Sequence, residues 1–147
     1  MFVSKYSRPL KLWRVSIPED YREELGDNFM LTPSIDGKPC LAGYNKQRFE
    51  DIFETLDRNG IDTSLLTADA AKVLCDSQGR ITIPQDLRDE KEGTPFTDSV
   101  MIVGAGPHIE IWSVADYEAS RKNPEAANLE RAEIGKKYKD LKRQAQP

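Results

Sequence analysis

A chain of 147 residues with 38% hydrophobic and 31% charged side chains has the composition of a folded protein, large enough for one ordinary core or for two small lobes that share one. No apolar run approaches the roughly 20 residues of a membrane span, and the first residues lack the apolar stretch and cleavage site of a signal peptide, so we expect a cytoplasmic protein with no membrane partner. The formal net charge of −4 disfavours nonspecific binding to nucleic acid, and any DNA binding would depend on a local basic face.

The first part of the chain predicts short strands that alternate with helices. The stretch 14–17 is β-branched and alternating, as in a half-buried strand. Pro18 suits the first position of a helix, because its missing N–H would have no partner there, and Gly26 can end that helix. In chain order we predict strands over 6–12 and 14–17, a helix from Pro18, strands over 29–35 and 39–44, and a closing helix. Asn45 can cap this closing helix, which carries Phe49, Ile52, Phe53 and Leu56 on one face.

The second part of the chain repeats this order of elements. Gly106 serves the turn between its later strands, as Gly37 does in the first part. Ser113 and Asp116 form a pattern that resembles a capping box at the start of its closing helix. The corresponding predictions are strands over 71–75, 80–83, 99–105 and 108–113, with helices from Pro84 and after Ser113.

The two parts also correspond residue by residue. Arg80 follows Arg14 by 66 positions, and the residues after each arginine match in type up to a proline. Further along the shift becomes 68, as from Tyr44 to Trp112, which a difference in loop length explains. We therefore predict an internal duplication. The predicted divisions are a first half over 1–60, a second half over 61–122 and a charged helical tail over 123–147.

The tail predicts one amphipathic helix. Its apolar seam consists of residues spaced by four, three and four positions: Ile134, Tyr138, Leu141 and Ala145. The favoured interpretation is that this seam packs on its own subunit or on a neighbour. The alternative is a basic arm that lies along DNA, because the tail holds six basic and four acidic side chains.

The clearest local motif is the turn DSQGR, Asp76 to Arg80. Aspartate can accept hydrogen bonds from main-chain N–H groups two residues on, and Gly79 tolerates positive φ, so this turn holds Arg80 outward. The matching stretch of the first half, Leu10 to Arg14, keeps only the arginine. Since Trp13 stands where the glycine would be and does not easily adopt positive φ, we expect the first hairpin to turn differently or to form a looser strand.

The stretch DSQGRITIPQDLR, together with VMIVGAGPHIEIWSVADYE, resembles the MraZ family of bacterial regulators, and the order of motifs agrees over roughly residues 1–122. The resemblance implies an α+β fold in which two tandem swapped-hairpin, AbrB-like halves form a pseudo-twofold, β-barrel-like core with short helices. It implies a DNA-binding transcriptional regulator of the cell-division and cell-wall gene cluster, located at the nucleoid. It also implies homo-oligomeric rings, larger than a dimer, that bind repeats in promoter DNA.

The arginines of the two turns are the main candidates for contact with double-stranded DNA, since a guanidinium can meet a phosphate or the O6 and N7 atoms of guanine. The candidate DNA-binding residues are Arg14, Arg80, Lys11, Arg8 and Lys5. In the alternative interpretation Arg14 and Arg80 pair with carboxylates at a subunit interface. Arg22 and Arg88 are expected to form salt bridges on a solvated face. Trp13 is expected to pack at an interface or, alternatively, to stack on DNA.

Catalytic and cofactor chemistry has little support in the sequence. The single histidine, His108, lies in a predicted hairpin and is interpreted as structural, and no carboxylate spacing indicates a metal site. The stretch from Gly104 to Gly106 resembles the start of a dinucleotide-binding fingerprint, but it lacks the third glycine and the helix that follows in that motif. We therefore predict a protein without cofactor or enzymatic activity. The alternative function is a ring-forming interaction protein of the same fold that has lost specific DNA binding.

Overall fold

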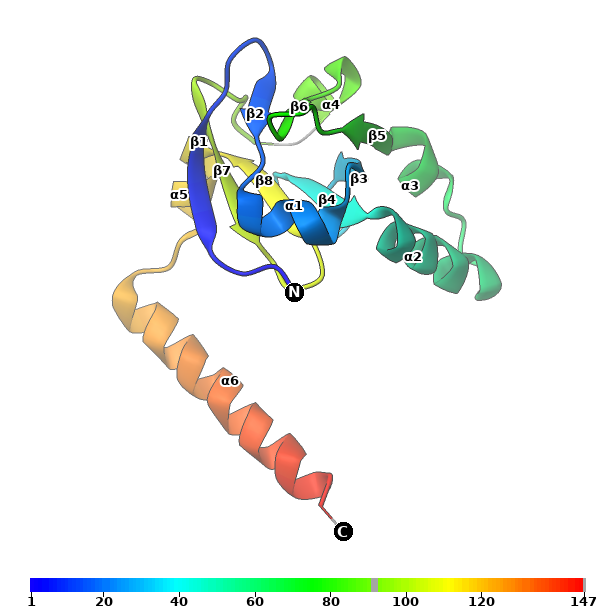
Figure 1. Cartoon of the computed structure of the whole chain (residues 1–147). Helices are drawn as coiled ribbons and strands as arrows, with labels where there is room; N and C mark the ends of the chain where they lie inside the picture. Colours follow the sequence, from blue (N-terminus) through cyan, green and yellow to red (C-terminus); the bar gives the residue numbers. More distant parts are fainter. Residues whose placement is uncertain (91–92, 147) are drawn as a thin grey trace.

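Strands and helices alternate along residues 1–90 and 93–146, which are the residues that the structure, a computed structural model, describes (Figure 1). The strands are β1 (Lys5–Pro9), β2 (Arg14–Ser16), β3 (Asn28–Pro33), β4 (Leu41–Asn45), β5 (Ala71–Leu74), β6 (Arg80–Thr82), β7 (Ser99–Gly104) and β8 (Ile109–Ser113). The helices are α1 (Glu19–Leu25), α2 (Lys46–Arg58), α3 (Ser64–Asp69), α4 (Gln85–Glu90), α5 (Val114–Ser120) and α6 (Pro124–Gln144). The α+β class predicted from the sequence is confirmed, with mostly antiparallel strands.

The larger sheet interleaves strands from the two parts of the chain. Its order is β1-β7-β8-β4-β3-β5, and every neighbouring pair is antiparallel. β1 therefore pairs with β7 from the second half of the chain, and β5 pairs with β3 from the first half. Because each half places a strand beside the other half, the sheet exists only when both are present.

A second, two-stranded sheet joins β2 to β6. The register places Arg14 opposite Thr82, Val15 opposite Ile81, and Ser16 opposite Arg80. Successive side chains of a strand point to opposite faces. Val15 and Ile81 are each 1% exposed and face the core, so Arg14, Ser16, Arg80 and Thr82 share the outer face of this ribbon.

Main-chain contacts repeat with the 66-residue shift found in the sequence. The N–H of Ile17 donates to the carbonyl of Gly79 at 2.9 Å, and the N–H of Ile83 donates to the carbonyl of Trp13 at 2.8 Å. Each of these bonds ties one strand of the ribbon to the turn of the other half. The duplicated sequence therefore produces duplicated hydrogen bonding around the ribbon.

Most local predictions of helix ends hold. α1 follows Pro18 and ends at Gly26, whose φ is 84°. Asn45 caps α2 by accepting from the N–H of Gln47, and Ser113 caps α5 by accepting from the N–H of Asp116. The short helix α3 has no counterpart among the predicted elements, because its sequence shows no apolar stripe. None of its residues is buried in the structure.

The helix α6 runs away from the sheet (Figure 1). None of its described residues is buried, and large apolar side chains on it are exposed: Leu129, Ile134, Tyr138 and Leu141. In the part of the chain that the structure describes, no helix is long and apolar enough to cross a membrane.

Candidate nucleic-acid interface

The outer face of the β2–β6 ribbon brings the two motif arginines together. Arg14 lies opposite Thr82, and Arg80 is two residues away from Thr82 on the same strand. Diagonal neighbours of this kind lie about 7 Å apart in an antiparallel pair. Ser16 and Thr82 lie on the same face, so it carries two hydroxyl groups as well as the two guanidinium groups.

The first turn is a tight two-residue hairpin turn. The N–H of Arg14 donates to the carbonyl of Lys11 at 2.9 Å, and the N–H of Lys11 donates to the carbonyl of Arg14 at 3.1 Å. Leu12 and Trp13 have φ values of 52° and 62°. The expectation that this hairpin turns differently from the second one holds. Its premise was wrong, because Trp13 does adopt positive φ.

Contacts from the second half hold Trp13 in this conformation. The guanidinium carbon of Arg88 lies 4.5 Å from the centre of the Trp13 ring, and Ile83 bonds to the Trp13 carbonyl. A cation over an indole face contributes about 0.5 to 2 kcal/mol, which is comparable to the cost of one left-handed residue. Trp13 therefore packs against Arg88 of the same chain, whereas the favoured interpretation had placed it at an interface.

The second turn has the hydrogen bonds and the glycine conformation that the DSQGR sequence predicts. One carboxylate oxygen of Asp76 accepts from the N–H groups of Gln78 and Arg80, both at 2.9 Å, and Gly79 has φ 77°. The other oxygen accepts from Nε of Arg80 at 2.9 Å. The N–H of Arg80 above all, with the other donors, holds the pKa of the Asp76 carboxyl below its usual range, so Asp76 is ionised at neutral pH.

The two motif arginines therefore differ in freedom. Arg14 is exposed, and within the described residues its side chain makes no hydrogen bond or ion pair. Arg80 is half-buried, and its Nε donates to the Asp76 carboxylate. The terminal nitrogens of its guanidinium therefore remain for another ligand. Arg14 is thus the freer of the two for a ligand, and Arg80 is the better fixed.

The remaining candidate cations spread along β1 and its turn. Lys11 lies in the first turn and is exposed. Arg8 is half-buried, donates to the Ser7 carbonyl at 3.2 Å and covers the ring of Tyr6 at 5.1 Å. Lys5 stands at the other end of β1, with its ammonium 5.9 Å from the ring centre of Tyr117. The structure therefore places Lys11 in the same turn as Arg14, while Lys5 lies apart from them beside α5.

Arg22 and Arg88 support the ribbon from within. Sequence reasoning placed them in salt bridges on a solvated face, but both are half-buried and donate to main-chain carbonyls. Nε of Arg22 bonds to Ile17 at 2.7 Å, and Nε of Arg88 bonds to Ile83 at 3.0 Å. The guanidinium of Arg22 lies over Gly79, as that of Arg88 lies over Trp13. The 66-residue shift relates Arg22 to Arg88, and the two arginines support the two turns in equivalent ways.

Comparison with known proteins gives consistent matches over most of the chain. The family model for MraZ protein matches residues 11–68 and again 66–134. A protein named transcriptional regulator MraZ from Alkaliphilus oremlandii is 33% identical over 149 residues, covering 96% of this chain and 99% of its own. Proteins of the same name from Caldicellulosiruptor saccharolyticus and Clostridium acetobutylicum are 33% and 32% identical, over 87% and 92% of this chain and 89% and 99% of their own.

Proposed function

Because the chain belongs to the MraZ family of transcriptional regulators, we propose that it binds double-stranded DNA specifically and regulates a cell-division and cell-wall gene cluster at the nucleoid in the cytoplasm. The observation that carries this proposal is the outer face of the β2–β6 ribbon, which carries Arg14 and Arg80 as diagonal neighbours. We further propose that the two halves are swapped-hairpin units, because β2 pairs with β6 and each strand is tied to the turn of the other half.

A two-stranded ribbon has the right width for DNA. The major groove of B-DNA admits a two-stranded β-ribbon, and arginine reads guanine there through two parallel hydrogen bonds. The buried Val15 and Ile81 anchor the ribbon, so its outer face is fixed before a ligand arrives. A fixed face loses little conformational entropy when it binds, which favours affinity for the same set of contacts.

The acidic net charge limits what one chain can do alone. One ribbon supplies few phosphate contacts, and nonspecific affinity grows with the number of phosphates neutralised. Several ribbons on one homo-oligomer would act at high effective concentration on repeated DNA elements. The proposed function therefore includes self-assembly into rings larger than a dimer and a promoter with repeated sites.

Binding of the DNA upstream of the protein's own gene tests the proposal. We expect fluorescence anisotropy to show saturable binding that weakens as salt rises, with the same DNA in scrambled order binding at least about tenfold more weakly. Equal binding to both sequences would argue against specific regulation. Absence of any binding at low salt, with the oligomer intact, would favour the alternative of an interaction protein that has lost DNA binding. The departure of the first turn from DxxGR is the observation behind that alternative.

The proposed self-assembly rests on α6 and on a groove in the rest of the molecule. The apolar seam of α6, Ile134 with Tyr138 and Leu141, is 54% to 64% exposed. A groove of about 430 Å³ lies between the β3–β4 turn, α2 and α3. Its apolar lining includes Pro33, Ile35, Leu56, Leu65 and Leu66, and Asp62 and Asp69 line it too. We propose that α6 of a second copy occupies this groove, because basic side chains flank the seam and acidic ones line the groove.

Ile134→Glu is expected to lower the mass of the assembly, because it places a charge in the seam. Ala132→Glu is the matched control, since it adds the same side chain on the opposite face of the helix. Multi-angle light scattering at micromolar concentration measures both. Leu65→Glu in the groove should act like Ile134→Glu. If Ile134→Glu lowers the mass and Leu65→Glu does not, the seam pairs elsewhere, for example with another α6.

A further inference from the structure

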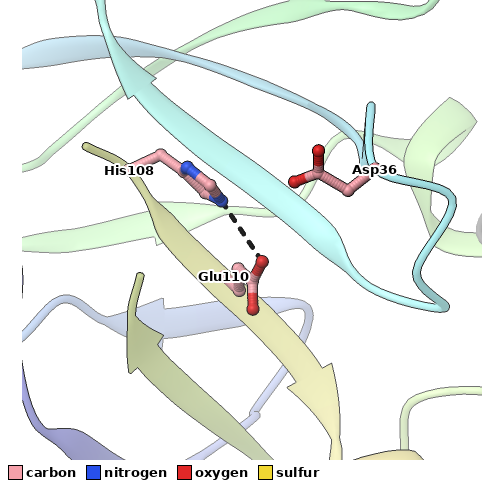
Figure 2. A group of neighbouring side chains, drawn as sticks. All are labelled: Asp36, His108 and Glu110. Atoms are coloured by element: carbon pink, nitrogen blue, oxygen red, sulfur yellow. Dashed lines mark hydrogen bonds and ion pairs between the residues drawn. The ribbon is translucent and has the colours of Figure 1, made fainter. Parts of the chain in front are cut away.

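A histidine and two carboxylates converge beneath the β3–β4 turn (Figure 2). Asp36 is exposed on that turn, while His108 and Glu110 are buried at the start of β8. One oxygen of each carboxylate and one ring nitrogen of His108 all lie within 4.8 Å of one another. Two segments 72 residues apart in the chain thus bring three groups able to bind a metal to one place.

Glu110 is the centre of this group. Its carboxylate is 5% exposed and accepts from Nε2 of His108 at 3.2 Å, from Nε1 of Trp112 at 3.2 Å and from Nζ of Lys38 at 3.3 Å. The donors come from three different side chains and converge on this one buried carboxylate. Lys38 is the cation now placed beside it.

We propose that Asp36, His108 and Glu110 form a binding site for one divalent transition-metal cation such as Zn²⁺, with the ammonium of Lys38 taking the place of that cation when no metal is bound. The separation of 3.2 Å between Nε2 of His108 and Oε2 of Glu110 fits this reading. Two ligands about 2.1 Å from a tetrahedral zinc ion lie about 3.4 Å apart. The proposal goes beyond regulation of transcription and does not depend on it.

The third ligand and the competing lysine can both adjust. Asp36 belongs to an exposed turn, so it can close the remaining distance without disturbing the sheet. The side chain of Lys38 is 47% exposed and can move into solvent. The ring of Tyr44 lies 4.9 Å from the ring of His108 and supports its orientation. Binding would therefore change the turn and leave β8 in place.

The ligand set selects the kind of metal. An imidazole nitrogen favours zinc and other transition metals, whereas Mg²⁺ and Ca²⁺ prefer sites made of oxygen ligands alone. The thiol of Cys40 is not among the ligand atoms that lie within 4.8 Å of one another. A site of three protein ligands leaves one position for water.

Isothermal titration of the full-length protein with Zn²⁺ tests the proposal, with Mg²⁺ titrated in parallel. We expect one zinc per chain and no comparable binding of Mg²⁺. Asp36→Ala, which changes an exposed residue, and His108→Gln should each weaken zinc binding by about tenfold or more. Lys38→Ala should strengthen it severalfold, because the competing cation is gone. Thermal unfolding of each variant without metal checks that it folds.

The variants also separate this site from accidental binding. Zinc affinity that is unchanged in Asp36→Ala and His108→Gln would place the metal elsewhere and overturn the proposal. So would failure of both the parent protein and Lys38→Ala to bind zinc. Binding of Mg²⁺ as tight as that of zinc would indicate attraction by carboxylates alone. Weaker zinc binding in Lys38→Ala would show that Lys38 does not compete.

Discussion

Arg14→Ala is expected to weaken the binding of promoter DNA by about tenfold or more, and Arg80→Ala by less. Arg14 is exposed and has no partner among the described residues, so its guanidinium is available for DNA. Arg80 already bonds to Asp76 at 2.9 Å, and part of its role is to hold the second turn. Repetition through an oligomer would enlarge the loss for Arg14, because each chain loses the same contact.

Anisotropy titrations of both variants against specific and scrambled DNA measure this difference. Arg48→Ala removes an exposed cation from α2, outside the ribbon, and serves as the control for net charge. Light scattering confirms that assembly is unchanged. Arg14→Ala with unaltered affinity for every DNA and an intact assembly would refute the proposed role of Arg14. Equal losses in Arg14→Ala and Arg80→Ala would contradict the inequality.

Gly79→Ala is expected to lower the free energy of unfolding by about 3 kcal/mol. A Cβ atom at Gly79 would lie 2.0 Å from Cζ of Arg22, so Arg22 would have to move and lose its bond to Ile17. Loss of a hydrogen bond from a charged donor costs about 1.5 to 3 kcal/mol. The left-handed backbone, with φ 77°, adds about 1 kcal/mol for any residue with a side chain.

Urea unfolding at one fixed protein concentration measures the effect, because assembly makes stability depend on concentration. Gly60→Ala is the matched control: its φ is 71° and nothing lies within 4 Å of the added atom, so only the backbone cost of about 1 kcal/mol remains. Leu12→Gly should instead raise stability, by up to about 1 kcal/mol, since Leu12 is exposed and has φ 52°. A cost for Gly79→Ala no greater than that for Gly60→Ala would remove Arg22 from the explanation.

Local chemistry made much of the fold predictable. Pro18, Gly26, Asn45 and Ser113 act at helix ends through their own backbone or side chain, and the structure places them as predicted. The duplication also predicted correctly that the two parts would share an order of elements. The pairing of β1 with β7 could not be derived from composition or periodicity, because strand partners depend on contacts between distant segments.

The candidate site was predictable only in part. Arg80 was found because Asp76 and Gly79 define its turn within five residues. The conformation of Trp13 was missed because it depends on Arg88, which is 75 positions away in the chain. The convergence of Asp36 with His108 and Glu110 was missed for the same reason, since no short spacing in the sequence relates the two segments.

The interleaving of β1 with β7 also constrains the order of events during synthesis. Lys5 pairs with Val103, so β1 leaves the ribosome long before its partner exists. At about 5 to 20 residues per second, the nascent chain carries this unpaired edge for about 5 to 20 seconds. The first half cannot complete its tertiary structure in that interval, and folding must wait for contacts of long sequence separation, which are formed slowly. Nascent chains halted before β7 should therefore be the species that chaperones bind and proteases cut.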